Sequence, residues 1–212
     1  MKNLNLKKEI LNHVFSRKVV GDLLKKGSNE IFDCAARQYV SDFENKTYGE
    51  IFSEIYVILG KERRNEYYYM NILFNYILEE IEGLACNREP ERISMFSQKW
   101  IGRSVADFIV IKNDGNEDGE VFEIKSDLDN LSRLQGQLED YHRAFDTVSV
   151  LSSEDECKKI EDVLAKFGEM GKATGIHVLS DNGSYFSVLH GREPYPFVKN
   201  LDHKCIFNLL RK

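Results

Sequence analysis

The 212-residue sequence has few of the residues that build disulfide frameworks or zinc sites. It contains four cysteines and five histidines. The cysteines are widely spaced and include no Cys-x-x-Cys pair, and the histidines are equally dispersed, which excludes the usual zinc-ligand spacings. Because nothing signals a disulfide framework, a reducing compartment fits best.

Long apolar runs, proline and phosphate-binding glycine loops are also scarce or missing. No apolar stretch approaches the length that spans a bilayer, and the N-terminus, MKNLNLKKEIL, has no apolar signal core. We therefore expect a cytoplasmic protein with no membrane partner and no ATP dependence of its own. Only 3 prolines occur and no linker divides the chain, while 42% hydrophobic residues suffice for a packed core.

The charge is negative overall but unevenly distributed. The formal net charge is −6, which by itself argues against nucleic acid as a partner. Residues 1–27, however, carry seven basic residues against two acids, a net charge of +5 that leaves −11 for the remainder. A basic arm suits phosphate contacts, and a solvated helix face explains it equally well.

Two parts of the chain differ in their apolar periodicity. Helical spacing predicts short helices at 6–15, 18–27 and 48–60, with glycines as boundaries, and a longer helix from about 65 to 82. From residue 93 the pattern becomes that of strands, at 93–100, 105–111 and 120–126, the last two joined by the hairpin turn KNDGNEDG. We therefore expect a helical N-terminal extension over 1–60 and a main domain over 61–212.

The rest of the main domain alternates between helices and strands. A helix is expected at about 127–145, where Ser126 and Asp129 resemble a capping box, followed by a strand at 147–151. Ser153, with Glu156 in the capping-box position, would open the next helix, and strands at 175–180 and 185–191 and a helix at 197–210 complete the chain. This order predicts an α/β (α+β) fold.

Charged residues on two neighbouring expected strands suggest one site. Asp107 lies in an apolar strand, and Glu123 and Lys125 share one face of the next strand. The hairpin would bring both carboxylates within reach of one hard cation such as Mg²⁺, with an ammonium beside it. Taken alone, these three residues are more commonly a solvated cross-strand face with weak charge pairing.

Two expected helices add polar residues directed towards the same sheet. Glu66 lies in line with the apolar stripe of the long helix and should point towards the sheet, although the helix dipole also favours an acid in a first turn. On the helix after the third strand, Gln137 borders the buried stripe one turn before Tyr141. Its amide could reach the carboxylates, although a flank residue beside a core tyrosine is the commoner arrangement.

In combination these residues resemble the PD-(D/E)XK nuclease superfamily. The resemblance consists of Glu66 on a first helix, Asp107 on a strand, the EIK run from Glu123 to Lys125 on the next, and Gln137-x-x-x-Tyr141 on the following helix. The last pattern is similar to that of the RecB-like branch, and residues 49–151 resemble a poorly characterised bacterial family with this core. The sequence VAD has no proline before Asp107, as in many members of the superfamily.

The resemblance implies a restriction-endonuclease-like αβββαβ core, with a mixed sheet flanked by helices. It also implies a Mg²⁺- or Mn²⁺-dependent nuclease that hydrolyses phosphodiester bonds, in DNA rather than RNA. Lys125 would act on the attacking water, and Gln137 and Tyr141 would steady the site. The implied metal ligands are Asp107, Glu123, the Ile124 carbonyl and Glu66. Arg103 and Arg133 are candidates for phosphate contacts, although a solvated surface charge is the commoner role for either.

Two alternatives remain open. A nuclease-like fold without catalysis could act as an adaptor for nucleic acid or a protein, although the complete set of Asp107, Glu123 and Lys125 argues against it. The helical N-terminal extension could instead bind a protein partner or a second copy of the chain. Its aromatic residues, whose helical spacing suits core packing as well, include Phe32, Tyr39, Phe43 and Tyr48.

Overall fold

The computed structural model describes residues 9–62, 64–85, 92–113, 119–126, 129–181, 186–197, 201–202 and 204–206, and all statements below concern these. The chain forms two compact units, Met1–Tyr68 and Tyr69–Lys212. In the described residues, no helix combines the length and the apolar content needed to cross a bilayer.

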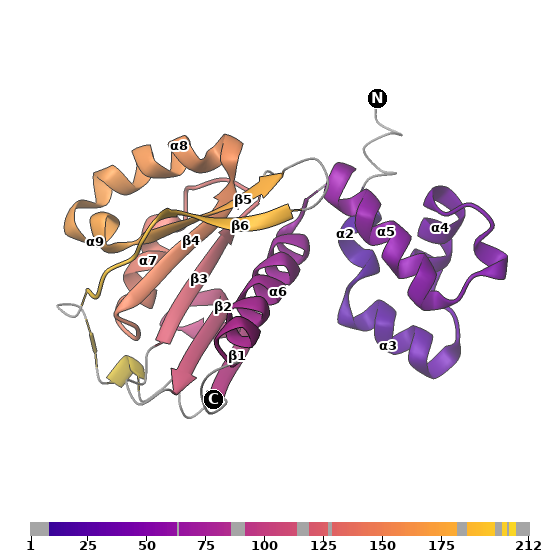
Figure 1. Ribbon diagram of the computed structural model, residues 1–212, viewed down its shortest axis with the longest axis horizontal. Coiled ribbons are helices and arrows are strands. Elements are labelled where there is room, and N and C mark those ends of the chain that lie inside the picture. Colours follow the sequence, from indigo (N-terminus) through magenta and orange to yellow (C-terminus); the bar gives the residue numbers. More distant parts are fainter. Residues whose placement is uncertain are drawn as a thin grey trace. The chain divides into compact units, whose positions relative to one another are not determined.

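The N-terminal unit is helical, as expected. Its elements are α2 (Leu11–Val14), α3 (Arg17–Lys26), α4 (Glu30–Tyr39), the 3₁₀ turn η1 (Phe43–Asn45) and α5 (Tyr48–Glu62) (Figure 1). Helix α4 was not expected from the sequence. The Asn29 side chain caps it by accepting the N–H groups of Ile31 and Phe32 at 3.0 and 3.3 Å. The Phe32 ring is buried between those of Tyr48 and Phe52, so it belongs to the core of this unit.

The C-terminal unit contains a mixed sheet whose elements follow the expected αβββαβ order. They are α6 (Glu66–Ala85, whose first residues belong to the N-terminal unit), β1 (Arg92–Ile101), β2 (Ser104–Asn113), β3 (Gly119–Lys125), α7 (Leu134–Tyr141) and β4 (Thr147–Ser153). They continue with α8 (Glu154–Leu164), η2 (Ala165–Phe167), α9 (Gly168–Ala173), β5 (Gly175–Asp181) and β6 (Phe186–Arg192). The six strands lie in chain order, with β4 parallel to both β3 and β5 and the other pairs antiparallel.

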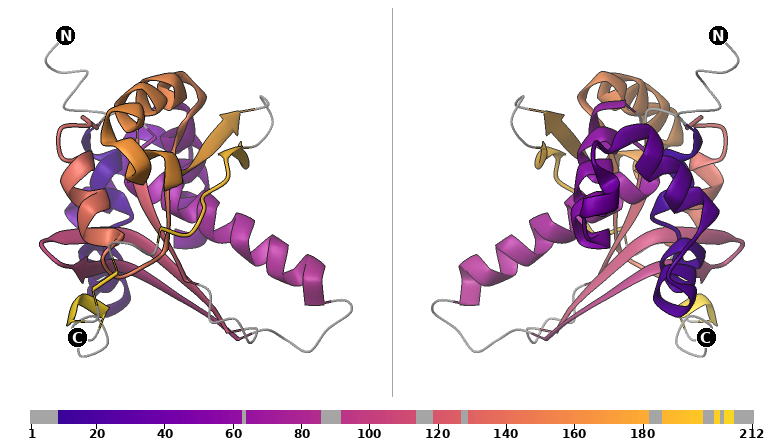
Figure 2. Two further views of the ribbon diagram at one scale, coloured as in Figure 1. Left: turned by 90° about the vertical axis from the view of Figure 1, so that its left-hand side faces the viewer. Right: turned by 90° about the vertical axis from the view of Figure 1, so that its right-hand side faces the viewer.

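Helices cover both faces of this sheet, which confirms the predicted mixed sheet flanked by helices. Helix α6 lies on one face, where Phe74 contacts Phe108 edge-to-face, and α7, α8 and α9 lie on the other (Figures 1 and 2). The second face holds a buried apolar cluster drawn from both the strands and the helices. Its members include Ile109, Val121, Leu134, Leu138, Tyr141, Val148, Val150, Ile160, Leu164 and Ile176.

Each predicted strand has a counterpart, but the start of one helix was predicted wrongly. Helix α7 begins at Leu134 instead of residue 127. Ser126 and Asp129 do pair, yet the Asp129 carboxylate accepts both the N–H and the hydroxyl of Ser126 within a turn. Asn130 likewise accepts the N–H and hydroxyl of Ser132. These side chains satisfy the backbone locally and so compete with the helix.

The predicted capping box at the next helix is also wrong in its chemistry. Ser153 occupies the N-cap position of α8, but its side chain makes no capping hydrogen bond, and its buried hydroxyl has no hydrogen-bond partner within the described part of the chain. Of the predicted closing helix at 197–210, residues 204–206 are helical, while 198–200, 203 and 207–210 lie outside the described residues. The middle of the predicted 112–119 turn lies outside them too.

Candidate active site

Strands β2 and β3 bring Asp107 and Glu123 to the same place on the α7 face of the sheet. The ladder between them pairs Phe108 with Phe122 as its last partners, so Asp107 and Glu123 are the next residues in register. Both carboxylates lie near the Tyr141 hydroxyl, since each of them raises the pKa of Tyr141. Both carboxylates are buried, Asp107 with 8% and Glu123 with 1% of the residue surface exposed.

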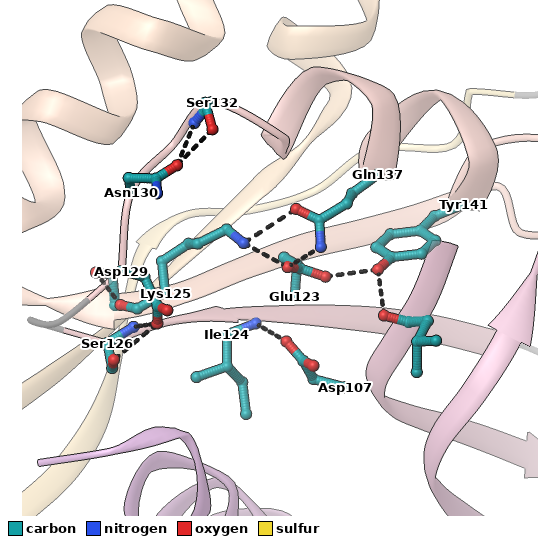
Figure 3. Close-up of polar contacts among 12 residues, drawn as sticks. Asp107, Glu123, Ile124, Lys125, Ser126, Asp129, Asn130, Ser132, Gln137 and Tyr141 are labelled. Atoms are coloured by element: carbon teal, nitrogen blue, oxygen red, sulfur yellow. Dashed lines mark hydrogen bonds and ion pairs between the residues drawn. The ribbon is translucent and has the colours of Figure 1, made fainter. Parts of the chain in front are cut away.

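The Asp107 carboxylate replaces backbone pairing at the point where the ladder ends. Its Oδ2 atom accepts the N–H of Ile124 at 2.8 Å (Figure 3). The Ile124 N–H would otherwise face the β2 backbone, so the side chain of Asp107 fixes the separation of the two strands here. The Asp107 carboxylate therefore lies beside Ile124. The resemblance described above implies the carbonyl oxygen of this residue as a metal ligand.

Glu123 is the centre of a buried hydrogen-bond network. Its Oε1 atom accepts from the Lys125 ammonium at 2.5 Å and from the Gln137 amide at 2.6 Å (Figure 3). Lys125, itself 5% exposed, also donates to the Gln137 carbonyl oxygen at 3.0 Å. Gln137 therefore contacts both members of the ion pair, and the predicted reach of its amide from α7 to the carboxylates is present.

Tyr141 contacts the other oxygen of Glu123. Its fully buried hydroxyl lies 2.6 Å from Glu123 Oε2 and 2.8 Å from the carbonyl oxygen of Val105. Because the hydroxyl has one proton and a carboxylate is the stronger acceptor, it donates to Glu123. Burial, and then the Glu123 charge, raise the pKa of Tyr141 far above its usual range, so this group is a hydrogen-bond donor and not a base.

Sequence reasoning missed Gln98, which completes the surroundings of Asp107. Gln98 lies on β1 between the pairs Ser97–Phe108 and Lys99–Ala106, and therefore opposite Asp107. Its φ of +55° is in the left-handed region, which is unusual for a residue with a long side chain. Its amide donates to Asp107 Oδ1 at 3.4 Å. The sequence carries no sign of this conformation, because the residue is neither glycine nor asparagine.

A second missed residue, Asp140, attaches α7 to the turn between β1 and β2. Its buried carboxylate accepts the Arg103 N–H at 2.9 Å and the Ser104 hydroxyl at 2.8 Å. Gly102 has a φ of +59° in this turn, and a Cβ atom there would lie 2.5 Å from Asp140 Oδ1. Asp140 thus positions the helix that carries Gln137 and Tyr141.

The structure does not gather every predicted residue around the carboxylates. Arg103 is exposed in the β1–β2 turn, where its backbone N–H makes the contact just described, and Arg133 is exposed immediately before α7. Glu66, the first residue of α6, belongs to the N-terminal unit, so its role stays a prediction. Asp107, Glu123, Lys125, Gln137 and Tyr141 form the assembled site.

The donor set of this site fits a magnesium ion. No group of three or more His, Cys, Asp or Glu side chains that could hold a metal occurs in the described residues. Mg²⁺, however, keeps several waters and is usually held by only one or two carboxylates together with substrate phosphates. Asp107 and Glu123 supply two such carboxylates against the one ammonium of Lys125, so a net negative charge remains to attract a cation.

Comparison with known proteins gives a match to a protein family. The family model described as bacteriophage P4 protein cII matches residues 61–212, which include every residue of the site described above. No curated protein and no solved structure matches the chain. Because the match covers well over half of the sequence, the chain belongs to the bacteriophage P4 protein cII family.

Proposed function

We propose that this protein is a metal-dependent nuclease that hydrolyses phosphodiester bonds, in DNA in preference to RNA, with Mg²⁺ or Mn²⁺. The αβββαβ order and the positions of the site residues support the resemblance to the PD-(D/E)XK superfamily. We also propose a cytoplasmic location, which suits the free thiols of Cys34, Cys157 and Cys205.

One observation carries the proposal: two carboxylates and an ammonium are almost fully buried in a single hydrogen-bonded group. Removing charges from water costs several kcal/mol per ion, and well-packed apolar residues of similar volume are often as stabilising or more so. Stability alone therefore gives little reason to keep Asp107, Glu123 and Lys125 together. A function that uses their charges accounts for the arrangement.

The residues have distinct roles in the proposed reaction. When bound by Asp107 and Glu123, the metal would lower the pKa of a water and offset negative charge on the phosphate. Lys125 would orient the attacking water and donate to a phosphate oxygen as negative charge increases there. The water oxygen forms a new bond to phosphorus while the bond to one sugar oxygen breaks, which yields a phosphate monoester and a free hydroxyl. Gln137 and Tyr141 hold Glu123 in place throughout.

Cleavage of supercoiled plasmid and of labelled single-stranded DNA, with Mg²⁺, Mn²⁺ or EDTA, tests this function. We expect metal-dependent cleavage that falls by about 10²- to 10³-fold in Lys125→Ala and Asp107→Ala. Glu139→Gln removes an exposed acid from α7 and is the matched control, which should cleave as the wild type does. Failure to cleave either substrate, together with no Mg²⁺ or Mn²⁺ binding by calorimetry, would overturn the proposal and favour the adaptor.

A further inference from the structure

A pocket of about 360 Å³ lies on the α6 face of the sheet, on the side opposite α7. Val121 belongs to the buried cluster beneath α7 and α8, so its neighbours Glu120 and Phe122 on β3 face the other side. Phe122 pairs with Phe108, and Phe108 contacts Phe74 of α6. Residues of α6, β2, β3, β5, the start of β4 and the segment after β6 line the pocket, all within the C-terminal unit. The pocket is therefore separate from the proposed catalytic site.

Apolar and aromatic side chains form much of the pocket wall. Tyr76 of α6, Phe122 of β3 and Pro196 after β6 are among them. The segment with Pro196 is attached to the start of β4, because Phe197 donates its N–H to the Asp146 carbonyl oxygen at 2.9 Å. Small-molecule sites have volumes of about 300–1,000 Å³ and mostly apolar linings, with a few polar groups that fix the ligand. The size and the walls of this pocket thus suit a small ligand with an apolar body.

Glu120 and His177 form a polar part of the pocket lining. The Ser149 hydroxyl donates to Glu120 Oε1 at 2.5 Å, and His177 Nε2 lies 3.7 Å from the same oxygen. The His177 ring is 3% exposed and packs edge-to-face against Phe122, with 5.1 Å between the ring centroids. These contacts fix the Glu120 side chain, which is 26% exposed, at the pocket surface.

The charges around the pocket are mainly negative. Among the described residues that line it, Glu120, Asp146 and Glu193 are acids and only Lys112 is a lysine or arginine. Three negative charges and one positive charge give −2, with histidine counted as neutral. A phosphate or carboxylate is therefore repelled and a cation attracted. The faces of aromatic rings add to this preference, because they attract cations as well.

We propose that this pocket binds a small organic cation, which has an ammonium or guanidinium group on an apolar or aromatic body. The cationic group pairs with the Glu120 carboxylate through a charge-assisted hydrogen bond, and the body packs against Phe122 and Tyr76. The inference goes beyond the proposed nuclease function and does not depend on it, because Glu120 and Glu123 lie on opposite faces of β3.

Calorimetric titration of the full-length protein with two amines tests the proposal. Tyramine carries an ammonium on an aromatic body, and agmatine carries a guanidinium and an ammonium on an alkyl chain. 4-Hydroxyphenylacetate, which has the ring of tyramine with a carboxylate in place of the amine, is the matched ligand control. We expect saturable binding of at least one amine, and binding of 4-hydroxyphenylacetate that is weaker by about tenfold or more.

Two pocket variants and a control locate the bound amine. Glu120→Gln removes the charge but keeps an oxygen for the Ser149 hydroxyl, and should weaken amine binding by about 10- to 100-fold. Thr147→Phe fills part of the pocket without changing its charge, and should weaken binding by a similar factor. Glu139→Gln removes an exposed acid from α7 and should bind as the wild type does. Thermal unfolding checks that each variant is folded.

The outcomes separate this inference from the proposed function. Binding of neither amine, equal binding of tyramine and 4-hydroxyphenylacetate, or unchanged affinity in a folded Glu120→Gln or Thr147→Phe protein overturns the pocket as a cation site. Any of these results would do so even if the wild type cleaves DNA. Binding that weakens in the pocket variants but not in Glu139→Gln supports the proposal even if the wild type shows no cleavage.

Discussion

At the scale of single residues, Lys125 neutralises a glutamate that has almost no access to water. Its ammonium lies 2.5 Å from Glu123 Oε1, and the two side chains are 7% and 2% exposed. Lys125→Met keeps the bulk but leaves the Glu123 charge uncompensated, so we expect a loss of about 3–5 kcal/mol in the free energy of unfolding. Urea unfolding followed by Trp100 fluorescence, which reports on the C-terminal unit, measures this loss.

The double variant Glu123→Gln with Lys125→Met distinguishes stability from function. Because both charges are absent, most of the lost unfolding free energy should return, while cleavage stays at the level of the single variant. A stable double variant that still cleaves DNA would contradict the assignment of Glu123 as a metal ligand. Equal stability of Lys125→Met and wild type would contradict the buried ion pair.

Tyr141 adds a pH dependence of known sign. Its folded pKa lies far above the ordinary value of 10.0, so between that value and the folded pKa the unfolded chain loses a proton that the folded chain keeps. The stabilisation is complete below about pH 10 and is lost progressively as the pH rises above it. Tyr141→Phe removes this titration, so its unfolding free energy should fall less steeply than that of wild type from about pH 9 to 11. Parallel urea midpoints over this range would contradict the prediction.

Single residues also show what the sequence could and could not reveal about the site. Strand alternation was enough to put Glu123 and Lys125 on one face, and helical spacing was enough to direct Gln137 and Tyr141 towards them. Gln98 could not be found in this way, because its position depends on a left-handed backbone that its residue type disfavours. Asp140 was missed because its partners lie in the turn after β1, far away in sequence.

At the scale of elements, the attachment of α7 to the β1–β2 turn controls the site. Gly102→Ala would place a Cβ atom 2.5 Å from Asp140 Oδ1 and force a side chain into a φ of +59°. We expect a loss of about 1–3 kcal/mol of stability and reduced cleavage, since α7 must shift and carries Gln137 with it. Gly136→Ala, on α7 with no atom within 4 Å of the new Cβ, should instead gain about 0.5–1 kcal/mol and cleave normally.

Thermal unfolding and cleavage rates of the two alanine variants provide this comparison. If Gly102→Ala cleaved as fast as Gly136→Ala, the turn would have no part in positioning α7. The comparison is informative because both variants add the same methyl group, one in a crowded left-handed turn and the other on an open helix surface.

Elements were predictable where burial and local propensity agree. All six strands were expected. Strands β2 to β5 are buried on both faces and form short apolar runs, whereas β1 alternates exposed and partly buried residues. The start of α7 was not predicted correctly, because Asp129 and Asn130 accept hydrogen bonds from nearby backbone N–H and hydroxyl groups before the helix begins. Gly21, expected as a boundary, lies inside α3, whereas Gly27 ends that helix with a φ of +72°. A glycine in a sequence does not say which of these roles it has.

At the scale of the whole molecule, the two faces of the sheet differ in what they carry. The α7 face contains the Glu123 carboxylate and the Lys125 ammonium beside Gln137 and Tyr141, and the α6 face packs apolar and aromatic residues such as Phe74 and Phe108. The family match from residue 61 to 212 takes in all of these features. The chemistry that we propose therefore belongs to the matched segment, and the helical N-terminal unit lies largely outside it.

The acid stability of the C-terminal unit should depend on His142, which joins distant parts of it. This fully buried side chain follows α7, lies 3.3 Å from the Thr174 hydroxyl before β5, and packs edge-to-face against Phe197 after β6. Burial lowers its pKa from 6.5 to about 4. Between pH 4 and 6.5 the imidazole is therefore protonated in the unfolded chain and neutral in the folded chain.

The stabilising effect of neutral His142 is thus complete above about pH 6.5 and is lost as the pH falls towards 4, by about 3 kcal/mol in all. His142→Leu preserves the apolar contacts, and Thr174 keeps its bond to the Met170 carbonyl oxygen. Its unfolding free energy should therefore fall less than that of wild type over this range, by urea unfolding read from Trp100. If the two proteins lost equal stability between about pH 7 and 4, His142 would not be a buried neutral group in the folded chain.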